Sequence, residues 1–320
     1  MTNGETLLTI SDLEIEYQAA GARIKAVDRV NIEMEARECI ALIGESGSGK
    51  STIANAILRI LPENSAIQQG EILFKGGSLL GLTEEEMRRV RGRDISMIFQ
   101  DPHSFLNPVL KIGDQLSETI KTHSLGLGKG KSLEKATELL SVVSIPDPVR
   151  ILSRYPHQLS GGMAQRVGIA LALSSDPALV IADEPTSALD LTIQAQVLKL
   201  LKGLRDRFDL SILLITHDLS LVSNIADRVY VMYSGQIVEE DRVDGLYRDP
   251  KHPYTVMLLE AVKKLQGSDT SYSAQTESRG ESAESRCRFL PRCPRAGSVC
   301  REKAPEYVRF PSGKKILCWE

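Results

Sequence analysis

The chain has 320 residues, 42% of them apolar and 5% aromatic, and a formal net charge of -3. This length suits one large domain with an appendage or two modest domains, while the charge and the low aromatic content argue against a binder of nucleic acid or anionic lipid. No stretch approaches the roughly 18 continuous apolar residues of a membrane span, and residues 1–10 do not resemble a secretory signal, so a role in transport would require other chains to form the pore.

Apolar patterns predict alternating strands and helices along most of the chain. The spacing of the apolar residues, together with turn residues, distinguishes the two. Strands are expected at 7–17, 24–34, 39–43, 95–99, 179–182 and 212–215, helices at 51–61, across about 60 residues after 99 and at 193–204, and a hairpin at 228–239. Short apolar runs separated by helices imply a mostly parallel sheet with helices on its faces, which is an α/β fold.

A glycine-rich loop follows the apolar run at 39–43 and opens a helix. It reads Gly44-Glu45-Ser46-Gly47-Ser48-Gly49-Lys50-Ser51 and fits the pattern G-x-x-x-x-G-K-[ST]. Glycines let such a loop fold tightly with its N–H groups turned toward a phosphate, and the helix N-terminus adds a positive end. Lys50 is expected to reach the β- and γ-phosphates, Ser51 to bind Mg²⁺ and Thr52 to join the nucleotide site. A flexible turn would not explain the lysine.

Two carboxylates, Asp183 and Glu184, end the apolar strand at 179–182. If this strand neighbours the strand before the glycine loop, both carboxylates lie beside the phosphates. We expect Asp183 to hold Mg²⁺ and Glu184 to act as general base toward the attacking water. A solvated strand end is the alternative for the pair taken alone, and the upstream loop makes the catalytic interpretation the stronger one.

The segment Leu159-Ser160-Gly161-Gly162-Met163-Ala164-Gln165-Arg166 resembles the signature sequence of ATP-binding cassette (ABC) ATPases. The resemblance covers about residues 7–264 and implies a P-loop NTPase (RecA-like) core, an antiparallel β subdomain and an α-helical subdomain near 101–166. It also implies a two-subunit sandwich, in which Ser160, Gly161 and Gly162 contact the nucleotide held by a partner subunit. A serine N-cap followed by glycines is the simpler interpretation of the same residues.

Other positions match the family in the same order. Gln100 looks like the glutamine-loop residue that touches Mg²⁺ or water and links to the membrane subunits. Ser187-Ala188-Leu189-Asp190 looks like the loop that crosses the dimer interface, with Asp190 near the nucleotide, and His217 looks like the histidine that contacts the γ-phosphate. Tyr17 is a candidate to stack on adenine, with an ordinary strand tyrosine as the alternative.

Three separated features are similar to the oligopeptide/dipeptide branch of the family: the segment at 100–108, His252-Pro253-Tyr254-Thr255, and the spacing of the last four cysteines. Membership implies a second and different ATPase subunit, two transmembrane permease subunits, an extracytoplasmic binding protein and a place on the cytoplasmic face of the membrane. Import of nickel, glutathione or oligosaccharides stays open, as does a soluble ABC ATPase without a transport role.

The last 35 residues differ chemically from the rest. Residues 286–320 carry a local charge of +6 and four of the five cysteines, Cys287, Cys293, Cys300 and Cys318. Their spacing, C-x5-C-x6-C-x17-C, lacks the close pairs typical of zinc sites, so it predicts a [4Fe–4S] cluster, with Zn²⁺ or unligated cysteines as alternatives. We expect three parts: a nucleotide-binding domain at 1–265, a flexible linker at 266–285 and this Cys-rich C-terminal extension.

Overall fold

The structure is a computed structural model that describes residues 5–19, 21–101, 105–124, 126–187, 189–265 and 286–319. The chain divides into two compact units. The first contains the described residues of 1–7, 35–39 and 78–215, and the second those of 8–34, 40–77 and 216–320. The chain therefore crosses between the units several times, and neither unit is one continuous stretch of sequence.

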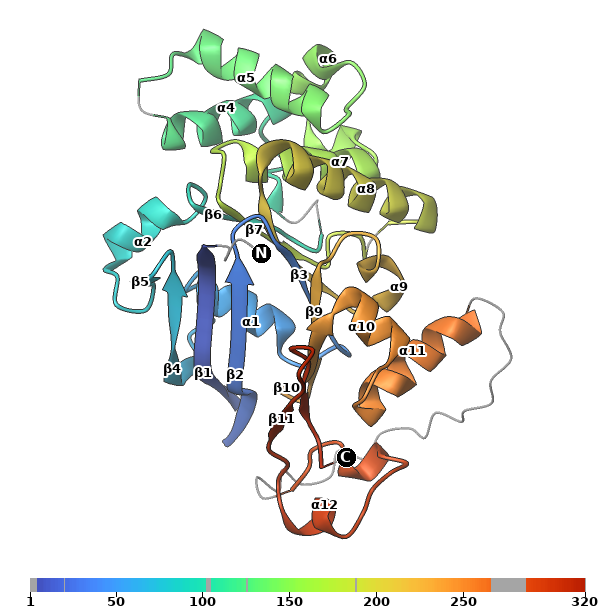
Figure 1. Ribbon diagram of the computed structural model, residues 1–320. Helices are drawn as coiled ribbons and strands as arrows, with labels where there is room; N and C mark the ends of the chain where they lie inside the picture. The colour runs from blue at the N-terminus through green and yellow to red at the C-terminus, as the bar shows by residue number, and fades with distance from the viewer. Residues whose placement is uncertain are drawn as a thin grey trace. The chain divides into compact units, whose positions relative to one another are not determined.

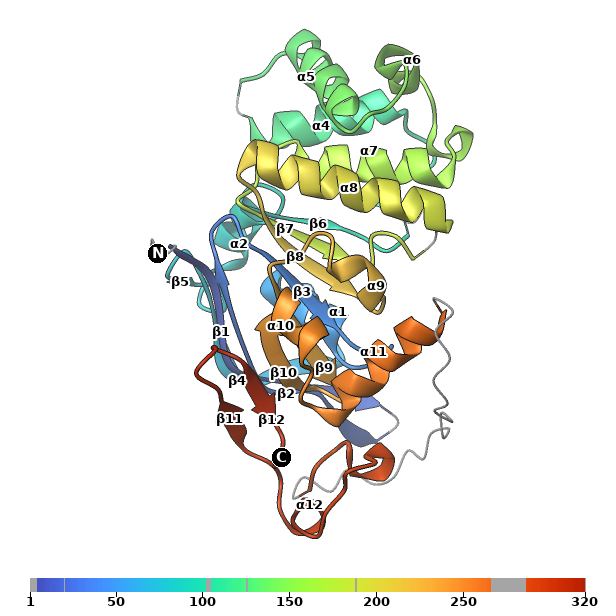
Figure 2. The same ribbon diagram turned by 45° about the vertical axis from the view of Figure 1, so that its right-hand side comes forward.

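Two long helices lie at the centre of the first unit. In Figures 1 and 2, α7 (Gly161–Leu173) and α8 (Leu191–Phe208) lie side by side, with a group of other helices on one side and three strands on the other. Among the described residues, the other helices of this unit are α2 (Glu84–Val90), α4 (Ile112–His123), α5 (Lys129–Val142), α6 (Pro148–Leu152) and the 3-10 turn η1 (Pro156–Gln158). Three of them, α4 to α6, fall within the segment predicted to be helical.

Three parallel strands complete the first unit. They are β6 (Ile95–Ile98), β7 (Leu179–Asp183) and β8 (Ser211–Thr216), with β7 between the other two. Ile98 is aligned with Ala182, and Asp183 with Ile215, so the strands end at the same edge. All residues of β7 and β8 are buried, as expected for strands covered on both faces.

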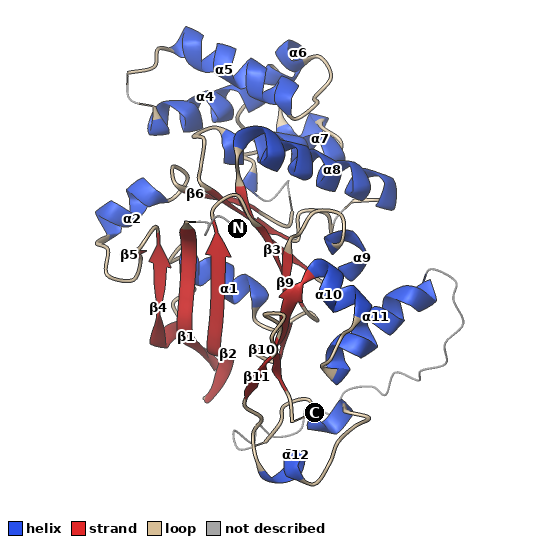
Figure 3. Cartoon of the chain, in the orientation of Figure 1, coloured by secondary structure: helices blue, strands red, loops and turns tan. Residues whose placement is uncertain are grey.

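An antiparallel sheet lies in the second unit, where Figure 3 shows its three long strands next to each other. The order is β2-β1-β4-β5, formed by β1 (Thr6–Ala19), β2 (Ala22–Glu35), β4 (Ser65–Phe74) and the short β5 (Gly77–Ser78). In β2, the buried Val30, Ile32 and Met34 alternate with exposed polar residues. One face of this sheet therefore packs on the core while the other meets solvent.

The second unit also holds five strands in the order β11-β12-β10-β9-β3. They are β3 (Cys39–Ile43), β9 (Arg228–Tyr233), β10 (Gln236–Arg242), β11 (Tyr307–Arg309) and β12 (Lys315–Leu317). The helices are α1 (Lys50–Ile57), α9 (Leu219–Val222), α10 (Val243–Arg248), α11 (Pro253–Leu265) and α12 (Val299–Glu302), with the 3-10 turn η2 (Leu290–Arg292). β3 and β9 are parallel, whereas β9, β10, β12 and β11 pair antiparallel.

The C-terminal segment, residues 286–319, is anchored to the strands by ion pairs as well as by pairing. Lys314 is 5% exposed, and its Nζ lies 3.0 Å from Asp241 Oδ2 and 3.6 Å from Glu239 Oε1. Lys315 Nζ lies 2.8 Å from Glu240 Oε2. Three consecutive acidic residues of β10 are thus buried against cations from this segment, which offsets the cost of removing their charge from water.

His252 caps the N-terminus of α11, and the structure predicts a pH effect at this residue. The ring is 2% exposed, and Nδ1 accepts a hydrogen bond from the Tyr254 amide at 3.1 Å. Burial lowers the pKa of His252 to about 4. Since an exposed histidine has a pKa near 6.5, the unfolded chain takes up this proton more readily than the folded chain between these values. Neutral His252 therefore makes its full contribution to the free energy of unfolding above about pH 6.5, and this contribution is lost as the pH falls toward 4.

Acidification from pH 7 to pH 5 should lower the free energy of unfolding by about 2 kcal/mol through this group. Replacing His252 with asparagine keeps a side-chain acceptor for the Tyr254 amide but removes the titration. Chemical denaturation at several pH values should therefore show that the free energy of unfolding of the variant falls less steeply between pH 7 and pH 5. Equal slopes for the variant and the wild type would contradict the assignment.

The predicted α/β, P-loop type of fold is confirmed, with local differences in the elements. The helix expected at 51–61 is shorter, because Leu58 ends α1 and Arg59 adopts a left-handed φ of 51°. β4, α2 and the strands of the C-terminal segment were not foreseen. The predicted linker at 266–285 lies outside the described residues, and the domain boundaries stay a prediction. None of the helices in the described ranges is long and apolar enough to cross a membrane.

Candidate active site

The glycine-rich loop connects β3 to α1 within the second unit, and close neighbours determine its shape. A Cβ atom on Gly44 would lie 2.1 Å from the Met232 carbonyl oxygen, and one on Gly49 would lie 2.4 Å from that of Ala26. Gly49 also has a φ of 107°, which favours glycine. These two glycines are therefore required by the packing of the loop as well as by its turn.

Lys50 is held inside this loop. Its side chain is 5% exposed, and Nζ donates hydrogen bonds to the carbonyl oxygens of Gly44 and Glu45, both at 2.8 Å, and to Ser48 Oγ at 3.2 Å. The ammonium group is thus placed in the loop at the start of α1, where the helix N-terminus is also positive. Closely spaced backbone amides and a fixed cation fit the phosphate groups of a nucleotide.

Two further residues from the predicted nucleotide site meet at α1. The Tyr17 hydroxyl lies 3.3 Å from Thr52 Oγ1, so the end of β1 approaches the first turn of the helix. Ser51, beside Thr52, is exposed. The loop, Tyr17, Thr52 and His217 all belong to the second unit, where His217 lies between β8 and α9.

The acidic residues and the glutamine lie together in the first unit. Gln100 follows β6, and its Nε2 donates a hydrogen bond of 3.0 Å to Glu184 Oε2. The buried Asp183 ends β7. Glu184 follows with a left-handed φ of 46°, while its amide donates to the Ile215 carbonyl at 2.8 Å. Backbone strain of this kind in a non-glycine residue is common at functional sites, where neighbouring structure maintains it.

The signature residues and Asp190 start two adjacent helices of the first unit. Ser160 is the N-cap of α7, with Oγ accepting from the Met163 amide at 3.4 Å, and Asp190 caps α8 by accepting from the Ile193 amide at 3.0 Å. A Cβ on Gly162 would lie 2.9 Å from Ile193 Cγ2. The glycine therefore allows the two helix starts to approach each other. Ala188 and residues 102–104 of the motifs named above lie outside the described residues.

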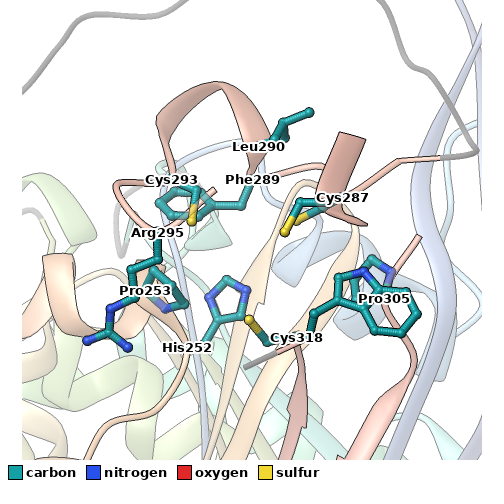
Figure 4. A pocket seen from close by; sticks show the side chains of 11 residues that line it. His252, Pro253, Cys287, Phe289, Leu290, Cys293, Arg295, Pro305 and Cys318 are labelled. Carbon is teal, nitrogen blue, oxygen red and sulfur yellow. The ribbon is translucent and has the colours of Figure 1, made fainter. Parts of the chain in front are cut away.

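The predicted iron–sulfur cluster is wrong. Cys287, Cys293, Cys300 and Cys318 line one small cavity of about 20 Å³, and Figure 4 shows three of them around His252. Nevertheless, the described part of the chain has no group of three or more His, Cys, Asp or Glu side chains arranged to hold a metal ion, which also removes zinc. The fold brings the four cysteines to one cavity but does not arrange their side chains as metal ligands. None of the five cysteines, all of which lie in the described residues, forms a disulfide.

Two residues in contact with the glycine loop were not identified from sequence. The Tyr254 hydroxyl accepts a hydrogen bond from the Glu45 amide at 2.9 Å, and Arg292 forms two hydrogen bonds of 2.8 Å with the Glu45 carboxylate. Tyr254 belongs to the motif at 252–255, which by itself indicates no contact with the loop. No local pattern could have indicated these contacts, because the partners are more than 200 residues apart.

Comparisons with known proteins agree with this geometry. A family model described as "ABC transporter" matches residues 27–187, and one described as "Oligopeptide/dipeptide transporter, C-terminal region" matches residues 238–300. The oligopeptide transport ATP-binding protein OppD of Bacillus subtilis is 48% identical over 82% of this chain and 73% of its own length. A probable peptide ABC transporter ATP-binding protein of Sinorhizobium fredii is 43% identical over 98% and 95% of the two chains.

A solved structure gives the same classification. The ATP-binding cassette MJ0796, described as a dimer in a post-hydrolysis state with ADP and phosphate, superposes with a TM-score of 0.67 at 26% identity. The superposition covers 74% of this chain and 99% of that one. The fold and the loop thus define a P-loop nucleotide-binding cassette. The chain belongs to the ABC transporter family, in the oligopeptide/dipeptide branch of its ATP-binding subunits.

Proposed function

We propose that this chain binds and hydrolyses MgATP and thereby drives an importer of dipeptides or oligopeptides. The observation that carries the proposal is the glycine loop with Lys50 held among its oxygens. The agreement of the relatives named above on peptide transport supports the substrate class. Membership of this family also supports a position at the cytoplasmic face of the membrane.

The roles of the nucleotide-site residues follow from their chemistry. The amides of residues 44–49 and the Lys50 ammonium bind the triphosphate, and Tyr17 stacks on the adenine. Thr52, whose Oγ1 lies 3.3 Å from the Tyr17 hydroxyl, joins the nucleotide site. Ser51, Gln100 and Asp183 offer the oxygen ligands that Mg²⁺ prefers. A Mg²⁺ ion held by these residues would neutralise charge on the phosphates.

Hydrolysis requires a group that accepts a proton from water. Glu184 is the general base, and the hydrogen bond from Gln100 holds its carboxylate in one orientation. His217 contacts the γ-phosphate. The attacking water loses its proton to Glu184 as its oxygen bonds to the γ-phosphorus and the bond to ADP breaks.

A second ATPase subunit completes each site in this proposal. Ser160, Gly161 and Gly162 start a helix whose amides cover the nucleotide bound by that second subunit, and Asp190 lies at the same junction. Closure of the two subunits acts on two transmembrane permease subunits through the region of Gln100. An extracytoplasmic binding protein delivers the peptide.

Peptide uptake by intact cells tests the substrate class. A strain that lacks this gene should fail to grow on a dipeptide or oligopeptide as its source of a required amino acid, and the wild-type gene should restore growth. Restoration should fail with Glu184→Gln. Unchanged peptide uptake together with loss of another solute would remove the peptide assignment and leave the ATPase assignment in place. The tagged chain should copurify with permease subunits.

A further inference from the structure

Glu45, the second residue of the glycine loop, is restrained on three sides. Its carboxylate accepts two hydrogen bonds of 2.8 Å from the Arg292 guanidinium. Its amide donates to the Tyr254 hydroxyl at 2.9 Å, and its carbonyl accepts from Lys50 Nζ at 2.8 Å. The side chain, amide and carbonyl of this one residue are thus bound by three different parts of the chain, and of these three contacts the one with Arg292 pairs a cation with the negative charge of the carboxylate.

Arg292 is itself firmly placed. It ends η2, next to Phe289, whose buried ring packs at 5.1 Å from the Tyr233 ring and 5.5 Å from the Tyr254 ring. The guanidinium lies 5.7 Å from the centre of the Tyr233 ring. The hydrogen bonds with Glu45 are the main cause that raises the pKa of Arg292. A planar guanidinium that binds both oxygens of a carboxylate sets its orientation as well as its charge.

The position of this pair bears on nucleotide binding. Glu45 places a negative charge in the loop that must hold a polyphosphate, and an unpaired carboxylate there would repel it. Attachment of the C-terminal segment does not by itself require Arg292, since Lys314 and Lys315 pair with β10 and Arg288 Nη2 lies 2.5 Å from Asp28 Oδ2. The pair of Arg292 with Glu45 thus joins this segment to the loop directly.

We propose that Arg292 is a positioning residue for the phosphate loop, which sets the affinity for MgATP by neutralising and orienting Glu45. The inference rests on the proposed nucleotide-binding function. It makes the C-terminal segment a part of the nucleotide site, although no residue of that segment belongs to a nucleotide-binding motif.

Steady-state hydrolysis and equilibrium binding of MgATP by the full chain test the proposal. Arg292→Ala should raise KM and Kd by roughly three- to tenfold, as expected for a close charge pair, and change kcat by less than about twofold. Arg292→Lys, which keeps the positive charge but cannot bind both carboxylate oxygens as a planar guanidinium does, should recover part of the affinity. Lys315→Ala is the matched control, because it removes an ion pair of the same segment with β10 and should leave KM unchanged.

A double-mutant cycle separates this role from simple docking of the segment. In a Glu45→Gln background, Arg292→Ala should alter Kd by less than about twofold, because no unpaired carboxylate is left beside the phosphates. An equal effect in both backgrounds, or a rise in KM with Lys315→Ala as large as with Arg292→Ala, would overturn the proposal. If a thermal melt shows that Arg292→Ala is poorly folded, Arg292→Lys takes its place in the double-mutant cycle. Absence of saturable MgATP binding by the wild type would instead reject the proposed function.

Discussion

Replacement of Glu184 by glutamine is expected to slow ATP hydrolysis by roughly 10²-fold or more, because general-base catalysis contributes about this much. Glutamine has nearly the same shape, and its amide oxygen can still accept the hydrogen bond from Gln100 that the carboxylate accepts at 3.0 Å. The left-handed backbone at this residue, with φ of 46°, is also available to glutamine at a similar cost. The variant thus removes a proton acceptor while the local structure remains.

Phosphate release at saturating MgATP measures this loss, and binding of labelled ATP by the same protein shows that the nucleotide site is intact. Asp206→Asn is a matched control, since it removes an acidic side chain that is 58% exposed and pairs with Arg205 on α8. Its turnover should equal that of the wild type. Near-normal turnover by Glu184→Gln would mean that another group accepts the proton.

The sequence predicted those parts of the site that are encoded locally. Residues 44–51 are contiguous, so the spacing of Gly44, Gly49 and Lys50 determines a loop whose cation lies among its own carbonyl groups. The acidic pair could likewise be placed at a strand end from the apolar run before it. Parallel strands bring their carboxyl ends to one edge, which accounts for the hydrogen bond between Gln100 and Glu184 across 84 positions.

Contacts that depend on tertiary packing could not be obtained in this way. Arg292 and Glu45 are separated by 247 positions, and neither residue type is unusual in its own segment. The pairing of β12 with β10 depends on buried charges, Lys314 with Asp241, that look like solvated residues in a sequence. The cysteines show the opposite error, since a spacing without close pairs predicts a cluster, whereas the described side chains are not arranged to hold a metal ion.

Removal of the Lys50 side chain should have the largest effect on nucleotide binding. Lys50→Ala is expected to raise the Kd for MgATP by roughly 10²-fold and to reduce hydrolysis at least as much, because a charge-assisted contact with the phosphates is lost. The loop also loses the hydrogen bonds from Nζ to the Gly44 and Glu45 carbonyl groups. Buried acceptors left without a donor favour a different loop conformation. Nucleotide affinity therefore falls both because the phosphate contact is lost and because the loop changes shape.

Lys50→Arg distinguishes the charge from the geometry. The ammonium of Lys50 occupies a site that is only 5% exposed, with three acceptors within 3.2 Å, and a planar guanidinium is too large for it. Arginine should therefore restore little affinity, although it restores the charge. Titration with MgATP, with the exposed Lys199→Ala as control, checks both variants. Wild-type affinity in Lys50→Ala would show that the loop does not bind the phosphates, and affinity recovered in full by Lys50→Arg would show that charge alone suffices.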